Sequence, residues 1–288
     1  MLPVIFSFAC KEKVTTETLK KFAATESYPT DSYLDTVQNK RALVIVAHDD
    51  DDCIMSGTLA MLKTQGWIIK QYCLEKHQGV DPDRHPSELI SNGSELILSN
   101  DAYRVAPDTL HHEAYPMSYA EIDKQFYTAK VATALTALIN QFSPSVIFTL
   151  DDVKGGYGHP DHVFISRLVA DAAVRKVIPC MRIYQVVYTP HMENEIVFHW
   201  LDKRLKEWGY PNHSLTANRM YNVGGMPEPT VQVNISKFAH VKMKYLLAYN
   251  EDVRKNFRQF IPYYEEFDAE TYFGIFDREF FRVINIPM

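Results

Sequence analysis

The sequence predicts an α/β fold in which a Rossmann-like, mostly parallel sheet carries helices on both faces. The continuous apolar run at 42–47 and the largely apolar segment at 145–150 have strand length and are typical of strands buried on both faces. Segments with strand character alternate with segments of helical periodicity, as in consecutive β–α–β units. A polar cluster directly follows each apolar run, and ligands of such sheets bind beyond the carboxyl ends of the strands.

The expected elements are placed in order from residue 41 onward. The run over 42–47 is the first strand, and a helix over 53–64 and a strand over 67–74 follow it. Apolar residues at helical spacing predict a helix over 85–100, although Gly93 weakens this pattern. A short strand is expected over 102–105.

The second half of the chain continues the alternation. The clearest helix is expected over 118–142, where apolar residues recur near one face, and the buried strand over 145–150 follows it. The further elements are a helix over 162–177, a strand over 181–188, a helix over 193–208, a strand over 230–233 and a long helix over 235–257.

Composition excludes several classes of protein. The 288 residues are 46% hydrophobic and 23% charged, which is ordinary for a globular protein and argues against a disordered or fibrous chain. The net charge of −6 argues against a nucleic-acid partner, because no basic excess is present to neutralise phosphates. No apolar run approaches the roughly 18–20 residues that a membrane span needs.

The N-terminal segment is expected to lie outside the folded domain. Residues 1–10 resemble the end of a bacterial lipoprotein signal, with Cys10 as the lipidated residue, which predicts a lipid anchor and a location in the cell envelope. Without such a signal the protein would be cytoplasmic. Residues 11–40 are polar and are expected to form a linker or loosely docked arm, and residues 41–288 form the domain.

The chemistry is expected in two clusters, Ala47-His48-Asp49-Asp50-Asp51-Asp52 and Gly155-Gly-Tyr-Gly-His-Pro-Asp-His162. If the strands at 42–47 and 145–150 are neighbours, both clusters meet where the strand order reverses. Two histidines and a carboxylate are a common catalytic zinc set. His48 with Asp50 or Asp51, together with His159 or His162, would supply it. Either cluster alone is more typical of a solvated loop or a helix start, and their combination favours a site.

These residues resemble the motifs of the PIG-L/LmbE-like N-deacetylases, zinc hydrolases that remove acyl groups from amino sugars and related amides. The family motif A-H-P-D-D-E corresponds to residues 47–52, and G-H-P-D-H corresponds in full to residues 158–162. Near the C-terminus, residues 279–282 match the family element E-x-F-R. The resemblance runs from about residue 41 to the C-terminus.

The resemblance implies a role for each motif residue. His48, Asp51 and His162 would bind Zn²⁺, with Fe²⁺ as an alternative divalent ion. Asp50 would be the general base, His159 would stabilise the oxyanion, and Asp161 would orient a neighbouring group. Such an enzyme would attack the amide carbonyl of an N-acetylated sugar or glycoconjugate with zinc-bound water and release acetate and an amine.

Departures from the family pattern affect the expected substrate contacts more than the expected metal ligands. Asp49 and Asp52 replace the proline and the glutamate of the first motif. The position of the arginine with which sugar-deacetylating members contact substrate is Asn92 here, and Arg84 is a candidate to replace it in space. The other histidines, His77, His85, His111 and His112, are expected on the surface or in loops.

Two other functions remain open at this point. A phosphoesterase-like metallohydrolase would use the acidic cluster to hold two metal ions. A non-catalytic carbohydrate-binding protein of the envelope would keep the fold and lack turnover.

Overall fold

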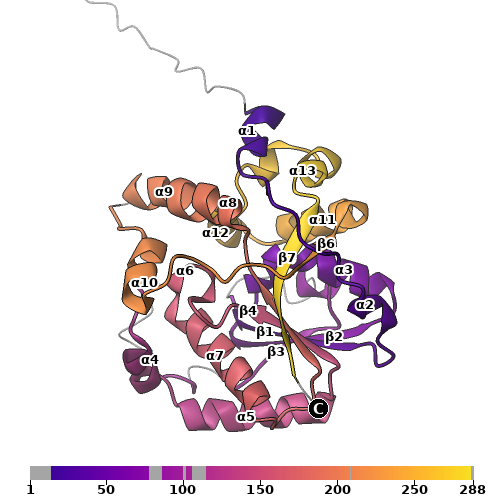
Figure 1. Cartoon of the computed structure of the whole chain (residues 1–288), viewed down its shortest axis with the longest axis vertical. Coiled ribbons are helices and arrows are strands. Elements are labelled where there is room, and N and C mark those ends of the chain that lie inside the picture. Colours follow the sequence, from indigo (N-terminus) through magenta and orange to yellow (C-terminus); the bar gives the residue numbers. More distant parts are fainter. Residues whose placement is uncertain (1–13, 78–85, 100–101, 106–114, 208, 287–288) are drawn as a thin grey trace, which may run out of the picture.

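A seven-stranded sheet with the order β3-β2-β1-β4-β5-β7-β6 forms the centre of the molecule (Figure 1). The computed structural model describes residues 14–77, 86–99, 102–105, 115–207 and 209–286. Strands β1 to β5 are parallel, whereas β7 runs antiparallel to both β5 and β6. The strands are β1 (Arg41–His48), β2 (Ile68–Glu75), β3 (Ser94–Leu96), β4 (Val146–Leu150), β5 (Arg182–Val186), β6 (Val231–Asn234) and β7 (Arg278–Asn285).

Helices cover both faces of this sheet, as the sequence predicts (Figure 1). One core lies under α5 (Thr128–Phe142) and α7 (Pro160–Val174), and the other lies under α3 (Ser56–Thr64) and α11 (Ala239–Ala248). Alternate residues of β1 divide between these two cores, since Val44 and Val46 pack on one side and Leu43 and Ile45 on the other. A strand with two buried faces explains why the run over 42–47 is continuously apolar.

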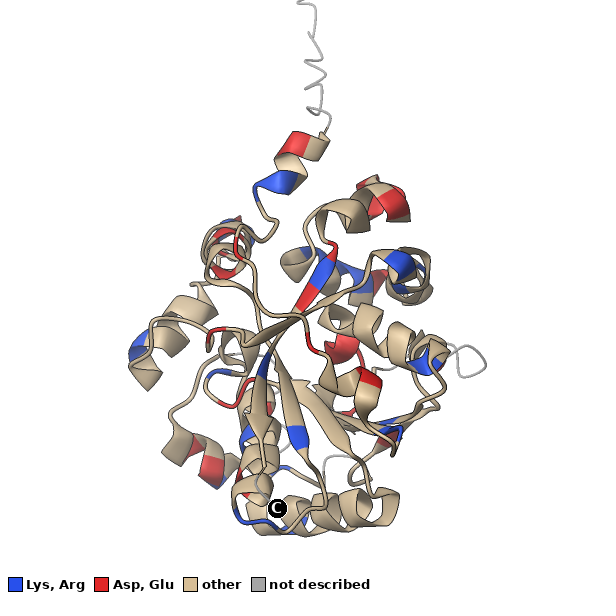
Figure 2. Ribbon diagram, turned by 45° about the vertical axis from the view of Figure 1, so that its right-hand side comes forward, with Lys and Arg blue, Asp and Glu red and all other residues tan. Residues whose placement is uncertain are grey.

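Further helices surround the carboxyl edge of the sheet and the side of the sheet that is formed by the C-terminal strands. In Figure 2, Lys and Arg are interspersed with Asp and Glu along the helices, in line with the small net charge of −6. These helices are α4 (Tyr119–Gln125), the short α6 (Gly155–Gly158), α8 (Pro190–Met192), a π-helix (Glu193–Trp200), α9 (Leu201–Glu207), α10 (His213–Tyr221), α12 (Glu251–Phe260) and α13 (Ala269–Ile275).

The region around residues 85–105 differs from the prediction. The helix expected over 85–100 is wrong, because a 3₁₀ turn at Pro86–Leu89 leads through Gly93 into the edge strand β3. Gly93 has φ of +121°, which a helix does not accommodate. The strand expected over 102–105 is also wrong, since Arg104 makes only an isolated bridge to Phe126.

Two expected long helices are each divided by a residue that the core requires. The helix expected over 118–142 is broken at Phe126, whose extended backbone turns its ring into the core to stack on Phe164 with centroids 4.1 Å apart. The helix expected over 235–257 is broken at Asn250, whose side chain accepts the N–H of Val253 and begins α12.

Residues 14–40 dock more closely than the expected linker or loose arm. They contain α1 (Thr16–Lys20) and α2 (Tyr33–Thr36), and Leu19 and Leu34 from these helices are buried in the core of the domain. Isolated apolar residues in a polar segment thus suffice to anchor it. Cys10, the predicted site of lipidation, lies outside the described residues. Within the described part of the chain, no helix is long and apolar enough to cross a membrane.

The C-terminal strand is fastened to the N-terminal half by a buried ion pair. Glu279 on β7 accepts the N–H groups of Gly57 (2.8 Å) and Thr58 (2.7 Å) at the start of α3. The ammonium of Lys242 on α11 donates to the same carboxylate at 2.5 Å, and both side chains are nearly inaccessible to solvent. A single carboxylate thus joins β7, α3 and α11, and the E-x-F-R element has a structural role here.

Replacement of Glu279 by alanine should strongly destabilise the protein. Because the Lys242 ammonium would remain buried without a counter-charge, with only its 3.4 Å bond to the carbonyl of Ile54, and two amide N–H groups would lose their acceptor, we expect the free energy of unfolding to fall by about 3–5 kcal/mol. Urea denaturation would measure this change. Glu270→Ala is the control, since this side chain is 81% exposed, and should change the free energy by less than about 0.5 kcal/mol. An unchanged denaturation midpoint for Glu279→Ala would contradict the role of the ion pair.

Candidate metal centre and active site

The two polar clusters meet at the carboxyl edge of the sheet. Strands β1 and β4 are paired in parallel, with Ala42 opposite Val146 and Val44 opposite Phe148, so the loops that follow them leave the same edge. Strand β1 lies between β2 and β4, and this is the point at which the strand order reverses. The expected convergence of residues 47–52 and 155–162 is confirmed.

Three potential ligand side chains from these clusters form a compact triangle. Nδ1 of His48 lies 3.2 Å from Nε2 of His162 and 3.5 Å from Oδ2 of Asp51. Nε2 of His162 lies 3.1 Å from the other oxygen of Asp51, Oδ1. Tetrahedral ligands with metal bonds of about 2.0–2.1 Å lie about 3.3–3.4 Å apart. The three side chains therefore lie close enough together to share one tetrahedral zinc ion.

Local hydrogen bonds orient these side chains. Oδ2 of Asp51 accepts the backbone N–H groups of Ala47 (3.0 Å) and His48 (2.8 Å). Nδ1 of His162 donates to the carbonyl of Gly155 at 3.0 Å, which leaves Nε2 free to bind a metal. Gly155 has φ of +56°, and a Cβ there would lie 2.5 Å from Cβ of His162. A glycine is therefore required beside this ligand.

The electrostatics of the triangle favour a cation. Burial would lower the pKa of His48, but the charges of Asp51, Asp161 and Asp50 outweigh burial and raise it to about 10. Burial would raise the pKa of Asp51, but His162 and His48 hold it well below its usual range. Without a metal, the carboxylate is thus balanced by a protonated imidazole. A divalent ion would replace that proton, so the donor set fits a metal in charge as well as in spacing.

Asp50 and His159 lie beside the triangle with different properties. Burial and the neighbouring carboxylates of Asp51 and Asp49 raise the pKa of Asp50 to about 6, against the opposing charge of His77 and His48. Burial and the neighbouring His162 and His48 keep the pKa of His159 well below its usual range. Nδ1 of His159 accepts the N–H of Asp161 at 3.2 Å, so the proton of the neutral ring is on Nε2. Asp50 is suited to accept a proton and His159 to donate a hydrogen bond.

Asp161 lies behind His48 and is held by an arginine. One carboxylate oxygen of Asp161 lies 3.8 Å from Nε2 of His48, and the same oxygen accepts a hydrogen bond from the Arg104 guanidinium. Arg104 in turn donates to the hydroxyl of Tyr103, which donates to Glu75 at 3.0 Å. Asp161 is therefore placed to orient an imidazole, as the motif implies. Sequence reasoning missed Arg104, because only the folded chain brings it to this carboxylate.

The two aspartates that depart from the family motif point away from the triangle. Asp52 is buried between Gln71, which donates at 2.9 Å, and the hydroxyl of Tyr245. Burial raises the pKa of Asp52 well above its usual range, although the hydrogen bond from Tyr245 opposes this shift. Asp49 is fully buried and accepts from His77.

His77 belongs to the site, contrary to prediction. It follows β2 at the carboxyl edge, where Nδ1 lies 2.6 Å from Oδ1 of Asp49 and Nε2 lies 3.6 Å from Oδ2 of Asp50. Hydrogen bonding to Asp49 and the charges of Asp50 and Asp49 raise its pKa although burial opposes them. No local motif marks this residue, and only its position after a predicted strand could have indicated it. His85, His111 and His112 lie outside the described residues.

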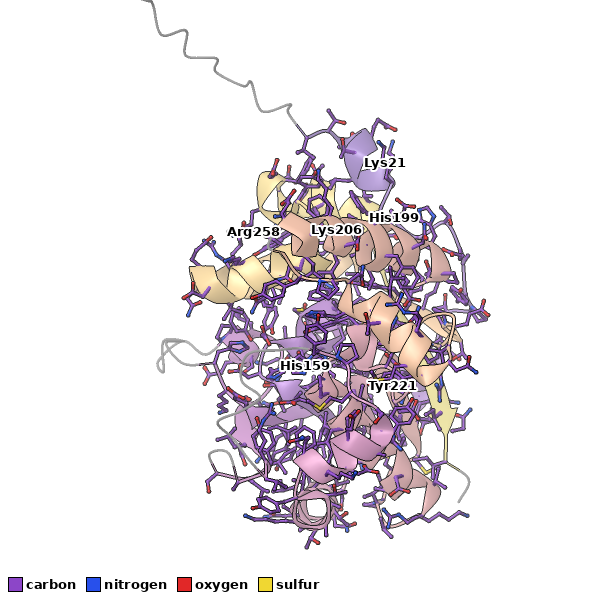
Figure 3. The ribbon with its side chains drawn as sticks, turned by 90° about the vertical axis from the view of Figure 1, so that its left-hand side faces the viewer. Lys21, His159, His199, Lys206, Tyr221 and Arg258 are labelled. Atoms are coloured by element: carbon purple, nitrogen blue, oxygen red, sulfur yellow. The ribbon has the colours of Figure 1, made fainter. Side chains whose placement is uncertain are left out.

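The side chains open into a cavity of about 520 Å³. Figure 3 shows His159 below the helices that carry Lys206 and Arg258, α9 and α12. The wall opposite the polar clusters is contributed largely by apolar and aromatic residues from the second half of the chain, among them Tyr188, Leu201, Leu205, Tyr210, Met226, Phe257 and Phe260.

Asn92 takes no part in this cavity. Its side chain accepts the N–H of Ile69 at 2.8 Å near the start of β2, at the edge of the sheet opposite to the site. Among the described residues that line the cavity, the arginine is Arg104, and Arg84 lies outside the described residues. The residue aligned with the family arginine therefore lies outside the cavity in which a substrate would bind.

Buried polar contacts support the loop that carries the second cluster. Asp151 accepts the N–H groups of Val153, Lys154 and Gly156 directly after β4. The Lys154 ammonium is fully buried and donates to Glu193 on the π-helix at 2.8 Å. It also donates to Ser214 and Asn218 on α10, at 2.6 and 2.7 Å. The loop that positions Gly155 is thus anchored to helices far away in sequence.

Comparison with known proteins supports the recognition of the family. Residues 43–173 match the PIG-L family model, described as GlcNAc-PI de-N-acetylase. A 1D-myo-inositol 2-acetamido-2-deoxy-alpha-D-glucopyranoside deacetylase of Thermobifida fusca is 29% identical over 170 residues, which are 50% of this chain and 58% of the relative. The protein of the same name from Nocardioides sp. is 33% identical over 173 residues, 50% of this chain and 57% of the relative. The chain thus spans somewhat more than half the length of these relatives.

Two solved structures superpose on most of the chain, at lower sequence identity than these relatives. An N,N'-diacetylchitobiose deacetylase from Pyrococcus horikoshii is 15% identical, with 88% of this chain and 89% of that chain covered and a TM-score of 0.45. A conserved protein from Thermus thermophilus is 18% identical, with coverage of 86% and 96% and a TM-score of 0.45.

Zinc binding should release a proton and strengthen as the pH rises. Because the pKa of His48 is about 10 without a metal, its imidazole is protonated at pH 7–9 and must lose that proton to bind zinc. We expect the affinity for zinc to rise about tenfold per pH unit in this range. Calorimetry in two buffers of different ionisation enthalpy would count the protons released.

His199→Ala is a suitable control for this measurement, because the side chain is 65% exposed on the π-helix and should leave the proton count unchanged. An affinity that does not vary between pH 7 and 9 would show that no proton is displaced from the ligands.

Proposed function

We propose that this chain, whose residues 43–173 belong to the PIG-L family, is a metal-dependent hydrolase that removes an N-acetyl group from an amino sugar or glycoconjugate. The observation that carries the proposal is the triangle of His48, Asp51 and His162, with sides of 3.1–3.5 Å, beside the carboxyl of Asp50. The cavity of about 520 Å³ has room for a sugar unit above this triangle. The deacetylase names of the relatives support the same chemistry.

Zinc is the metal that this donor set fits best. Two imidazoles and one carboxylate with an open position are typical of catalytic zinc, and Fe²⁺ is the alternative. When bound, such an ion is a Lewis acid that polarises a carbonyl and lowers the pKa of water toward about 7. His48 and His162 would hold it through the nitrogens that face each other, and Asp51 through the oxygen that faces His162.

The neighbouring residues supply the proton transfers. Asp50, with a pKa of about 6, is largely ionised at neutral pH and accepts a proton from the water that attacks the amide carbon. The Nε2–H of His159 donates to the oxyanion that forms on the carbonyl oxygen. As the carbon–nitrogen bond breaks, Asp50 returns the proton to the departing amine, and acetate and a free amino group result. Asp161 holds the ring of His48 throughout.

Amine release from a panel of N-acetylated sugars tests the proposal. The protein would be assayed as purified, after chelation and after addition of zinc. Muropeptide fragments belong to the panel because residues 1–10 predict a lipid anchor in the cell envelope. Metal-dependent release with one zinc per chain would support the proposal. Two metals per chain with phosphoester cleavage would indicate the phosphoesterase-like alternative, and glycan binding without release would indicate a binding protein.

Substitutions should separate the base from the ligands. We expect Asp50→Ala to retain one zinc and to lose about 10²–10⁴-fold in kcat, because general base catalysis contributes that much. His48→Ala and His162→Ala should lose the metal. Zinc content and kcat would be measured for each purified variant.

His240→Ala is the matched control for the histidine variants, since its side chain is 75% exposed and far from the triangle, and should keep both zinc and activity. Near-normal turnover by Asp50→Ala would show that another group is the base.

A further inference from the structure

We propose that His77, held by Asp49, is a positioning residue that fixes the carboxylate of Asp50 for proton transfer. This inference rests on the proposed function, because it concerns the base of that reaction. It goes beyond the two family motifs, in which proline stands at the place of Asp49 and which do not include His77.

The sheet explains why these three residues meet. His48 is paired with Glu75 in the parallel register of β1 and β2, so the chain segments beyond both residues leave the same edge side by side. Asp49 and Asp50 directly follow one strand, and His77 follows the other. Their contact is a consequence of the strand register.

Asp49 determines the orientation of the His77 ring. A single oxygen of Asp49 accepts both the backbone N–H of His77 at 3.0 Å and its Nδ1–H at 2.6 Å. Asp49 is fully buried, so this pair is shielded from competing water. With the main chain and one ring nitrogen both held, Nε2 can face only one way, and it faces Oδ2 of Asp50 at 3.6 Å.

The imidazole thus bridges two carboxylates, and each carboxylate favours a proton on the nitrogen that faces it. The Nε2–H directed at Oδ2 of Asp50 counteracts the repulsion of this carboxylate by the neighbouring Asp49 and Asp51. Once this contact shortens to a hydrogen bond, it would occupy Oδ2 and leave Oδ1 as the atom that accepts a proton from water. The separation of 3.6 Å needs to shorten by only about 0.5 Å to become a hydrogen bond, and catalytic hydrogen bonds commonly tighten when substrate binds.

Asp49, Asp50 and His77 could alternatively hold a second metal, since they offer ligand atoms within 4.8 Å of one another. The two assignments differ at Nε2 of His77, because a proton on this nitrogen makes it a donor to Asp50, whereas a lone pair there would bind a metal. The two assignments predict different metal contents.

The test compares His77→Ala with His77→Gln in the full-length zinc enzyme. We expect His77→Ala to lower kcat by about 10–100-fold, as is usual for residues that orient a catalytic group, with KM within about twofold and one zinc retained. His77→Gln keeps an N–H donor near Asp50 and should recover much of that loss. His199→Ala, an exposed imidazole outside the cavity, is the control and should match the wild type.

Wild-type kcat in His77→Ala would overturn the proposal while leaving the deacetylase function intact. Equal losses in the Ala and Gln variants would also overturn it, and so would a second metal that disappears with His77.

A spectroscopic measurement tests the proposal without a known substrate. In ¹⁵N-labelled protein, the Nδ1–H of His77 should be visible as a slowly exchanging, hydrogen-bonded proton, and Asp49→Asn should weaken and shift this signal. A ring protonated on Nε2 alone would overturn the proposal. A wild type that is inactive on every N-acetylated substrate would instead contradict the proposed function.

Discussion

The arrangement of the site depends on the contacts that the carboxylate of Asp51 makes. It is held at the end of β1 by two backbone N–H groups, and it faces both candidate metal-binding imidazoles. A buried carboxylate surrounded by further aspartates requires a positive charge. The parallel pairing of β1 with β4 brings His162 to it, and the same edge then presents Asp50 and His159 to the cavity.

Three further buried ion pairs join elements that are distant in sequence. Arg104 binds Asp161, Lys154 binds Glu193, and Lys242 binds Glu279. The buried carboxyl of Asp52 is instead held by hydrogen bonds from Gln71 and Tyr245. Each pair joins two elements, so the charges that the chemistry requires also constrain how the helices and loops pack around the carboxyl edge. Breaking one of these pairs would leave a buried charge uncompensated, which is far more costly than losing an exposed ion pair.

Sequence patterns predicted those features that are local. The strands over 42–47 and 145–150 are wholly or largely apolar, and the residues that follow them belong to recognisable motifs. Strand β7 was missed because Arg278, Glu279 and Arg282 interrupt its apolar residues, and those charges are satisfied only by tertiary contacts. His77 and Arg104 were missed for the same reason, since each acquires its role from a carboxylate brought close by folding.

The chemistry and the recognition of substrate come from different parts of the chain. The candidate metal ligands, the proposed base and the proposed oxyanion donor all lie within residues 43–173, the part that matches the family model. The opposite cavity wall comes largely from residues 188–260, where apolar and aromatic side chains predominate. Asn92 contacts the far end of β2 and cannot take the part of a substrate-binding arginine. If the proposed reaction is carried out by the matched segment, the wall that faces it can direct this reaction to a different acetylated compound.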